Sequence, residues 1–527
     1  MSSLHNTVPF FKSSSRAIER SLFASRQKYR DKIQKLQIRL ENLAKQHQRV
    51  VNEKRELERR LEQRKRELQN SRHEVARRSK AAVCLPLDPQ LNGHRFGARM
   101  IAMCCNLAKT VGFRAAEAVL SIIRNWLDVD FKIPSWSSIR TWLCRSGVAA
   151  LQEAAVPQDD WIWLVDHSVQ LGATHVLVVL GIRQCELPVG RALRHEDLKT
   201  LAVVPSTYRN KESVAEALKE LATQIGTPIC LLADGATELH QGAKVLQNTG
   251  QSVLVLDDIK HKAANILKKT LGKNSSFLEF ESLLGQTTAR IQQTELVHFL
   301  PPKKKTKCRF MNLVPLLNWA EMVNHHLQTP SAPGNDGVTT ERLNDKLGWA
   351  LQYQDDLKSW QACQNIVSAT LVFTNKQGVY PGATDELRKH LAELELPHDE
   401  LCEQVRDQLV EAFSKCEERL VDSPHASLRF PVSTEVLEST LGRFKQIQRQ
   451  HNRGSFTSLL AAFPALLKPT TPKTIANHLR MVNNRDVKTW LTKANLNDST
   501  QAKKNKAYRA AKKRNLDTKT LLLDRKI

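Results

Sequence analysis

Two aspartates occupy positions in this sequence where they could hold a metal ion. Asp166 follows the apolar run WIWLV, and Asp234 follows the apolar run PICLLA. Each run is typical of a buried strand, and a carboxylate at the end of such a strand loses hydration unless a cation or hydrogen bonds compensate it. If both strands end at one edge of a sheet, the two carboxylates form an all-oxygen site that suits Mg²⁺. The alternative is that each aspartate only caps the turn or helix that follows it.

The spacing of apolar residues indicates the elements that would position these aspartates. Short apolar runs predict strands at 161–166, 174–183, 198–205, 228–234 and 251–258. Amphipathic stretches predict helices at 213–226, at 237–250 and from 261 onward. This β-β-β-α-β-α-β-α order predicts a central sheet covered by helices. The order matches the ribonuclease-H-like fold, in which the first acid lies on the first strand and the second follows the fourth.

Four segments resemble the DDE transposases of bacterial insertion sequences, including Mutator-like and related transposases. The segments are LVDHSVQLG around Asp166, LLADGATEL around Asp234, VLDDIKHKAANILKK at 255–269 and STEVLESTLGRFKQ at 433–446. The third segment resembles a C/D-x-x-H element followed by Asn, which those transposases have after the fifth strand; here it is Asp258, His261 and Asn265. The resemblance covers roughly residues 95–465.

The resemblance implies a catalytic triad that is also the metal-ligand set: Asp166, Asp234 and Glu438. It implies Mg²⁺ as cofactor, with Mn²⁺ as the alternative, and two such ions would activate a water or a 3′-hydroxyl and stabilise the leaving oxygen. Those families also have a large helical insertion before the third acid, and the helical pattern from about 273 to 430 corresponds to it. Glu321 and Glu281 are rivals to Glu438 as the third acid.

Four further residues are candidates for contact with DNA. Residues 95–150 predict a helix, a turn and a second helix that carries Arg140 and Arg145, which is the pattern of a helix-turn-helix. Lys445 lies seven residues after Glu438, on the same face of the predicted helix, where some related transposases contact phosphate; a solvated helix face is the alternative. His261 is expected to orient a nucleophile or to bind near the flanking strand, and a helix cap is the alternative.

A heptad pattern at the N-terminus predicts a coiled coil. Its apolar members are Ile33, Leu36, Leu40, Leu43, Val50, Leu57, Leu61, Leu68 and Val75. The polar members His47, Lys54 and Arg64 weaken the seam between helices. We therefore expect a homodimer or a higher assembly on DNA, and a single solvated charged helix is the alternative.

The composition points to a polyanionic partner. Lys and Arg total 79 against 54 Asp and Glu, which gives a formal net charge of +25 and a pI of about 9.7. No apolar run is long enough to span a bilayer, so we expect no membrane association. The ten cysteines lack CxxC spacing, which indicates a reducing compartment without disulfides or a zinc site. The expected location is the bacterial cytoplasm, in association with the nucleoid.

These observations predict a mixed α/β ribonuclease-H-like core with a large all-α insertion. The predicted parts are a coiled coil at 1–80, a helical, helix-turn-helix-like DNA-binding region at 81–155, the first part of the core at 156–272, an all-helical insertion at 273–430, the final core helix with the third acid at 431–470 and a basic tail at 471–527. The predicted function is a DNA transposase that binds double-stranded DNA at the ends of its element and at the target. The alternatives are a transposase-derived DNA-binding or scaffolding protein without cleavage activity and a structure-specific nuclease of the same fold.

Overall fold

The structure of this protein is a computed structural model. It describes residues 9–78, 88–171, 174–206, 208, 210–235, 237–247, 252–303, 310, 313–329, 339–394, 397, 399–450, 457–496, 502 and 504–514. The chain divides into two compact units, one of residues 1–86 and 124–130 and the other of residues 87–123 and 131–527. Within the described ranges, no helix combines the length and the apolar composition that a membrane span requires.

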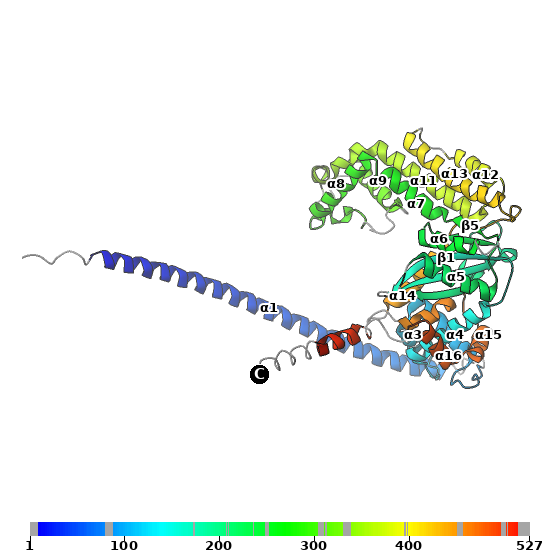
Figure 1. Cartoon of the computed structure of the whole chain (residues 1–527). Coiled ribbons are helices and arrows are strands. Elements are labelled where there is room, and N and C mark those ends of the chain that lie inside the picture. The colour runs from blue at the N-terminus through cyan, green and yellow to red at the C-terminus, as the bar shows by residue number, and fades with distance from the viewer. Residues whose placement is uncertain are drawn as a thin grey trace, which may run out of the picture. The chain divides into compact units, whose positions relative to one another are not determined.

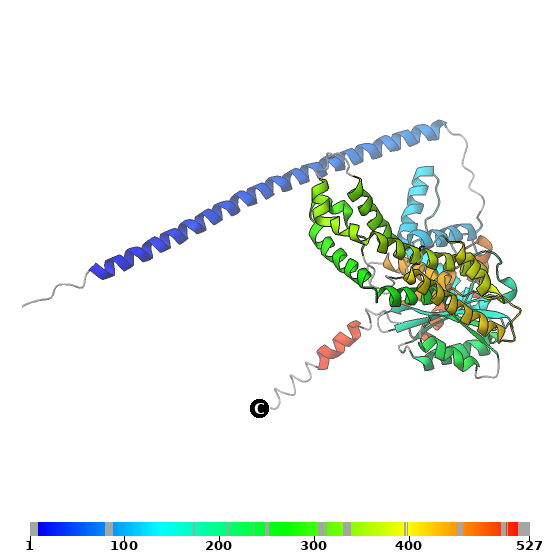
Figure 2. The same ribbon diagram turned by 90° about the horizontal axis from the view of Figure 1, so that it is seen from above.

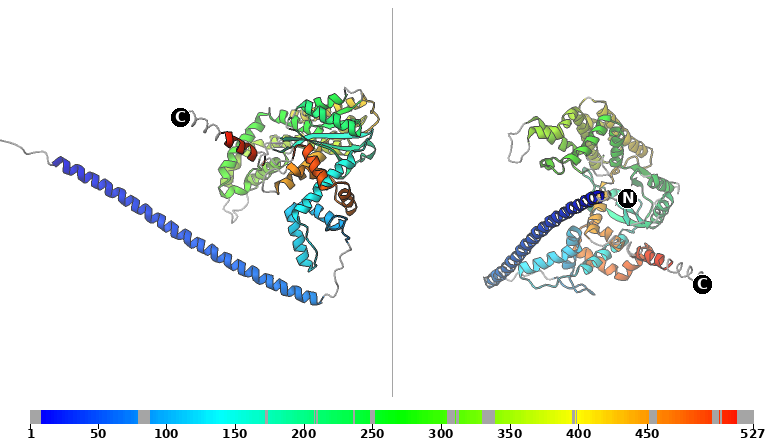
Figure 3. Two further views of the ribbon diagram at one scale, coloured as in Figure 1. Left: turned by 60° about the horizontal axis from the view of Figure 1, so that its bottom comes forward. Right: turned by 90° about the vertical axis from the view of Figure 1, so that its left-hand side faces the viewer.

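The predicted N-terminal helix is confirmed. Helix α1 runs without a break from Pro9 to Arg78, and Figure 3 shows it as one continuous, gently curved rod. The sequence favours this because it contains neither Gly nor Pro from residue 17 to residue 78. Apolar seam residues remain exposed in the single chain; the exposed fraction of Leu40, for example, is 69%. The coiled coil itself stays a prediction.

The second unit contains a mixed five-stranded sheet with the strand order β3-β2-β1-β4-β5. The strands are β1 (Trp161–Leu171), β2 (Thr174–Arg183), β3 (Lys199–Ser206), β4 (Cys230–Ala233) and β5 (Leu254–Asp257). The first three strands are antiparallel to one another, whereas β4 is parallel to β1 and β5 is parallel to β4. The five predicted strands are therefore present, together with the mixed α/β character of this region.

Helices cover both faces of the sheet (Figures 1 and 2). On one face, Trp161, Trp163 and Val165 of β1 belong to one apolar core together with residues of α5 (Lys211–Ile225) and α6 (Thr237–Gln247). On the other face, the alternate β1 residues share a second core with helices that include α7 (Ile259–Leu271) and α14 (Glu435–Arg449). Alternation along β1 thus decides which helices each side chain can meet.

A helical region separates α7 from α14, as the sequence predicts. Its helices are α8 (Ser275–Ile291), α9 (Val314–Gln328), α10 (Thr340–Leu347), α11 (Gln354–Gln377), α12 (Ala383–Ala392) and α13 (Glu400–Val421). Buried aromatic rings pack at its centre, with Phe277 and Phe280 edge-on to Trp360 at centroid distances of 5.0 and 5.1 Å. An ion pair of 3.1 Å between Arg419 of α13 and the buried Asp257 of β5 ties this region to the sheet.

The helices before the sheet pack against helices from the C-terminal part of the chain. The early helices are α2 (Ala98–Val111), α3 (Phe113–Leu127) and α4 (Trp136–Ala154), and Ser135 caps α4 by accepting a hydrogen bond from the Ser138 backbone. The later ones are the 3₁₀ helix η5 (Thr457–Leu466), α15 (Pro472–Met481) and α16 (Asn484–Lys493), and all three contact α4. The expectation of a basic tail from residue 471 is therefore wrong for residues up to 496, and a further helix spans 504–514.

The contact between α4 and η5 requires a glycine, which gives a first testable prediction. A Cβ atom added at Gly147 would lie 2.0 Å from the backbone oxygen of Ala461. We expect Gly147→Ala to lower the free energy of unfolding by about 2 kcal/mol, because the two backbones must separate. Gly285→Ala in α8 is the control, since its Cβ would meet nothing within 4 Å, and it should raise stability by about 0.5–1 kcal/mol. Urea unfolding measures both changes, and equal effects would contradict the close approach.

Candidate active site

Asp166 and Asp234 lie side by side at the end of β4. The parallel pairing of β1 with β4 ends at Val165 opposite Ala233, and the two aspartates are the next residues of each chain segment. The sequence predicts that Asp166 ends its strand, but this prediction is wrong, because β1 continues to Leu171 in a hairpin with β2. By alternation, both carboxyl groups belong to the face of the sheet on which α7 and α14 lie.

Asp258 connects the starts of α7 and α14. Its side chain is fully buried and caps α7 by accepting hydrogen bonds from the backbone of Lys260 and His261. The same carboxylate accepts bonds from the backbone and the hydroxyl of Thr434, the residue before α14. The backbone of Ile259 also donates to Val432, at 2.9 Å. These bonds fix α14 next to the sheet although the helical region separates Asp258 from Thr434 in the sequence.

His261 lies among the acidic residues of the site. Its Nδ1 is 3.0 Å from Asp258 Oδ2, and this bond points its Nε2 toward the other carboxylates. The Nε2 atom is 3.6 Å from Asp234 Oδ2 and 3.4 Å from Glu438 Oε1. One imidazole from the start of α7 thus bridges an acid that follows β4 and an acid on the first turn of α14.

A second cation, Lys260, holds Glu438 from the other side. Its ammonium group is 2.9 Å from Glu438 Oε2 and 3.3 Å from Glu435 Oε1. The sequence analysis missed Lys260, although its position between Asp258 and His261 could have indicated it. Among the rival acids, Glu321 lies exposed on α9 and Glu281 is partly buried on α8, both within the helical region. Glu438 is therefore the glutamate that the fold brings to the two aspartates.

The charges of these groups act on one another. Burial, together with the negative charges of Asp234 and Glu438, raises the pKa of Asp166 to about 6 against the opposing effect of His261. Burial alone would lower the pKa of His261, but the hydrogen bond and charge of Asp258 and the charges of Asp234 and Glu438 raise it to about 9. At neutral pH the site consequently holds an imidazolium among several carboxylates.

The donor set has the chemistry of a magnesium site, with carboxylate oxygens from three different elements. The raised pKa of Asp166 reflects its burial and the negative charges of Asp234 and Glu438, and a divalent cation would relieve the repulsion among these carboxylates. As the side chains stand, however, no three His, Cys, Asp or Glu residues of the described chain are close enough together to hold one ion. His261 and Lys260 instead lie against the carboxylates of Asp234 and Glu438.

The structure separates the residues that were expected to bind DNA. Arg145 is buried, and its guanidinium donates to the carbonyl oxygens of Val482 and Leu479, so the prediction that it contacts DNA is wrong. Its role is to hold α15 against α4, and α4 itself is enclosed from residue 142 to residue 149 rather than presenting a recognition face. Arg140 is partly buried and donates to the Ser458 hydroxyl, whereas Lys445 is exposed on α14.

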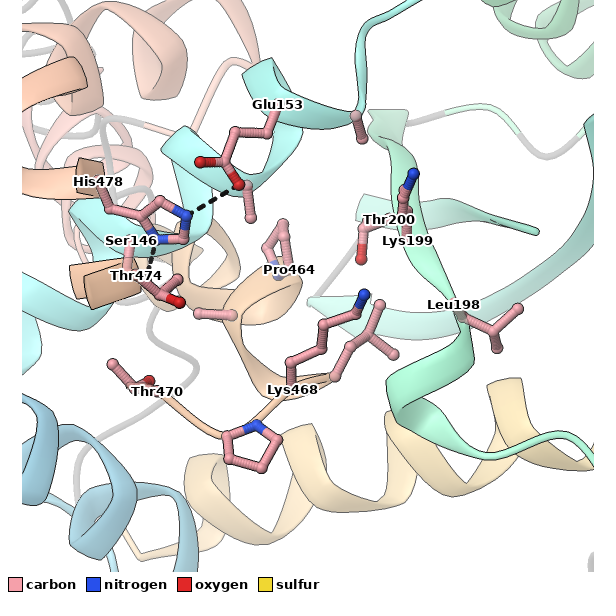
Figure 4. Close-up of a pocket in the computed structure, with 15 residues that line it drawn as sticks. Ser146, Glu153, Leu198, Lys199, Thr200, Pro464, Lys468, Thr470, Thr474 and His478 are labelled. Carbon is pink, nitrogen blue, oxygen red and sulfur yellow. Dashed lines mark hydrogen bonds and ion pairs between the residues drawn. The ribbon is translucent and has the colours of Figure 1, made fainter. Parts of the chain in front are cut away.

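A second polar cluster lines a cavity of about 310 Å³ between α4, β3 and the segment that follows η5 (Figure 4). His478 is buried between Ser146, at 2.8 Å from its Nδ1, and Glu153, at 3.0 Å from its Nε2. These residue types also occur in hydrolytic triads, but Ser146 is itself buried inside α4. Because the three groups satisfy one another, we assign them to the attachment of α15 to α4.

Comparisons with known proteins give little further information. No family model matches the chain, and no curated protein sequence matches it. One similar solved structure is a chain of a Drosophila P element transposase strand transfer complex, with 11% sequence identity and a TM-score of 0.37. The match covers 75% of this chain and 95% of that chain.

Proposed function

We propose that this protein is a DDE-type DNA transposase that cleaves and joins DNA strands with Asp166, Asp234 and Glu438. The observation that carries the proposal is that these three acids, far apart in the sequence, come together around His261. The strand order β3-β2-β1-β4-β5, with the first acid on β1 and the second after β4, supports a ribonuclease-H-like core. The helical region between α7 and α14 would be the insertion of that core.

In the proposed reaction, an oxygen atom of water or of a 3′-hydroxyl bonds to phosphorus while the bond to the leaving O3′ breaks. Asp166, Asp234 and Glu438 would hold Mg²⁺ or Mn²⁺. The metal would lower the pKa of the attacking water or hydroxyl and stabilise the negative charge that develops at the phosphate. The imidazolium of His261 can donate a hydrogen bond from Nε2 to a phosphate oxygen that enters between Asp234 and Glu438. Lys260 keeps Glu438 at the site, and Asp258 keeps His261 in orientation.

The test uses the purified full chain and DNA from the two flanks of its own gene, where the element ends would lie. We expect strand cleavage at the flanks that requires Mg²⁺ or Mn²⁺, followed by joining of the 3′ ends to a target plasmid. Unrelated DNA of equal length is the control for specificity. Binding without cleavage under all metal conditions would favour a scaffolding role, and cleavage of branched DNA irrespective of sequence would favour a structure-specific nuclease.

The basic charge predicts salt-dependent binding to duplex DNA. Each neutralised phosphate should contribute about 0.9 to the slope of log affinity against log salt, so affinity should fall by about 10³-fold or more between about 50 and 200 mM salt. The helix at 504–514 carries six Lys and Arg residues, and truncation after residue 496 should make the slope shallower. Fluorescence anisotropy with a labelled duplex measures both slopes. An affinity that hardly changes with salt would contradict the use of this charge for phosphate contact.

A transposase must hold two DNA ends together, and we propose that copies of this chain associate through α1. The exposed apolar seam of the helix supports this proposal. Polar residues at seam positions predict weak association of the free protein and stronger association on paired DNA ends. Sedimentation of the full chain with and without such ends measures this difference.

A further inference from the structure

One face of α1 carries an apolar stripe that the single chain leaves uncovered. The stripe consists of Ile33, Leu36, Leu40, Leu43, Val50, Leu57 and Leu61, whose exposed fractions lie between 54 and 69%. Charged pairs along the helix surface, such as Arg60 with Glu56 at 2.5 Å, contribute only about 0.2–0.5 kcal/mol each. Burial of this stripe against a second helix would therefore stabilise the 70-residue helix more than its surface ion pairs do.

The polar residues of the seam distinguish between the two orientations that a second copy of α1 could take. In a parallel, in-register pair, each seam residue faces its own counterpart. Lys54 would then meet Lys54 of the second copy, and Arg64 would meet Arg64. Both layers would place like charges in a largely apolar interface, where an unpaired charge is costly.

Two of the flanking charge pairs oppose the parallel orientation as well. One series of seam positions includes Lys54 and Leu61. In the parallel orientation, the residue just before each of these positions faces the residue five places later on the second copy. Glu53 would face Glu58, and Arg60 would face Lys65. Each pair would occur twice in the dimer, and like charges at these positions set the orientation by repulsion.

An antiparallel pair centred near residue 52 removes the like-charged layers of the seam. Lys54 then lies opposite Val50 of the second copy, and Arg64 lies opposite Leu40, so that each long side chain can cover an apolar neighbour and extend its charge to water. Leu61 meets Leu43. Among the flanking residues, Arg39 faces Glu67 in an attractive pair that occurs twice, whereas Glu53 faces its own counterpart only once.

We propose that α1 forms an antiparallel two-stranded coiled coil with α1 of a second copy of this chain. The inference rests on the association of copies proposed above and adds its geometry. Arg78, the last residue of α1, would lie about 80 Å from its counterpart, because the helices leave the centre in opposite directions. The parts of the two copies that follow α1 would therefore leave from opposite ends of the rod.

Distances between spin labels on the full chain test this orientation. A nitroxide is placed at Asp31→Cys or at Asn52→Cys, two exposed positions on the outer side of the heptad, and electron-electron resonance measures the separation between copies. The background carries Cys84→Ser, Cys185→Ser and Cys308→Ser. The other cysteines that the structure describes are buried, so labelling stays at the chosen site.

The antiparallel pair predicts about 65 Å between labels at residue 31 and about 30 Å or less between labels at residue 52. Distances of about 30 Å or less at both positions would show a parallel pair and overturn the inference, while the proposed DNA cleavage would stand. If no dipolar coupling is detected at either position in the presence of paired DNA ends, the association through α1 itself is overturned. Circular dichroism of each labelled variant checks that the helix content is unchanged.

Discussion

Replacing Asp166 with asparagine is expected to abolish DNA cleavage and, at the same time, to make the metal-free protein more stable at neutral pH. If Asp166 binds the metal as proposed, its loss removes several kcal/mol of transition-state stabilisation, which corresponds to a decrease in rate of about 10³-fold or more. The gain in stability follows from the raised pKa of the carboxyl group, from 3.8 to about 6. Above pH 6 the folded protein must keep an unfavourable charge there, and asparagine removes it.

The contribution of Asp166 to the free energy of unfolding depends on pH. A group whose pKa is higher in the folded state favours folding at low pH, and this contribution is lost as pH rises from 3.8 through about 6. In EDTA, Asp166→Asn should therefore have little effect below pH 4 and should raise the free energy of unfolding by about 2 kcal/mol at pH 7.5. Urea unfolding at the two pH values measures this difference.

Asp160, near the other end of the same strand, supplies a control of opposite sign. Although burial opposes it, the ion pair of 2.6 Å with Arg183 lowers the pKa of Asp160. Asp160→Asn should lower stability by about 1 kcal/mol and leave cleavage intact. A variant at Asp166 that cleaves DNA normally, or that loses stability at pH 7.5 as the Asp160 variant does, would contradict the catalytic assignment.

The second large effect is expected at Asp258. Its fully buried carboxylate caps α7, accepts bonds from Thr434 and orients His261. Asp258→Ala leaves these donors without a partner, and we expect the free energy of unfolding to fall by about 3 kcal/mol. DNA cleavage should also fall, because α14 and its Glu438 are no longer fixed next to the sheet.

Asp399 is the matched control for this variant, since it also caps a helix, α13, through a bond to the backbone of Leu401. Asp399→Ala should cost about 1 kcal/mol and should not affect cleavage beyond that loss of stability. Urea unfolding and the flank-cleavage assay on both variants make the comparison. If the two substitutions had equal effects on stability, the assignment of Asp258 as the joint between α7 and α14 would be wrong.

Local patterns were sufficient to predict most of the sheet and its helices. The apolar run of β2 was predicted at its observed bounds, and the predicted strands lie within a few residues of the observed ones. Asp166 and Asp234 were singled out because both follow apolar runs, and the parallel pairing of β1 with β4 places them together. The extension of β1 to Leu171 was missed, because it depends on the hairpin partner and not on the apolar run.

Long-range packing could not be read from local patterns. Arg145 is a basic residue on a helix of the predicted helix-turn-helix, which favours DNA binding. Its guanidinium instead donates to two carbonyl oxygens that lie more than 330 positions later in the chain. The sequence predicts a basic tail after residue 471, whereas Ile475 and Leu479 are buried against the rest of the fold. Glu438 can be assigned only through the resemblance, because the helical region separates it from the two aspartates in the sequence.

Localised iron cleavage can show whether Asp166, Asp234 and Glu438 form the single divalent-cation site that we propose. Fe²⁺ bound in place of Mg²⁺ generates hydroxyl radicals with ascorbate and peroxide, and these cut the polypeptide near the ion. We expect cuts close to residues 166, 234 and 438, which excess Mg²⁺ suppresses and Asp166→Asn abolishes. Cuts near Glu321 or Glu281, or an unlocalised pattern that Mg²⁺ does not change, would contradict it.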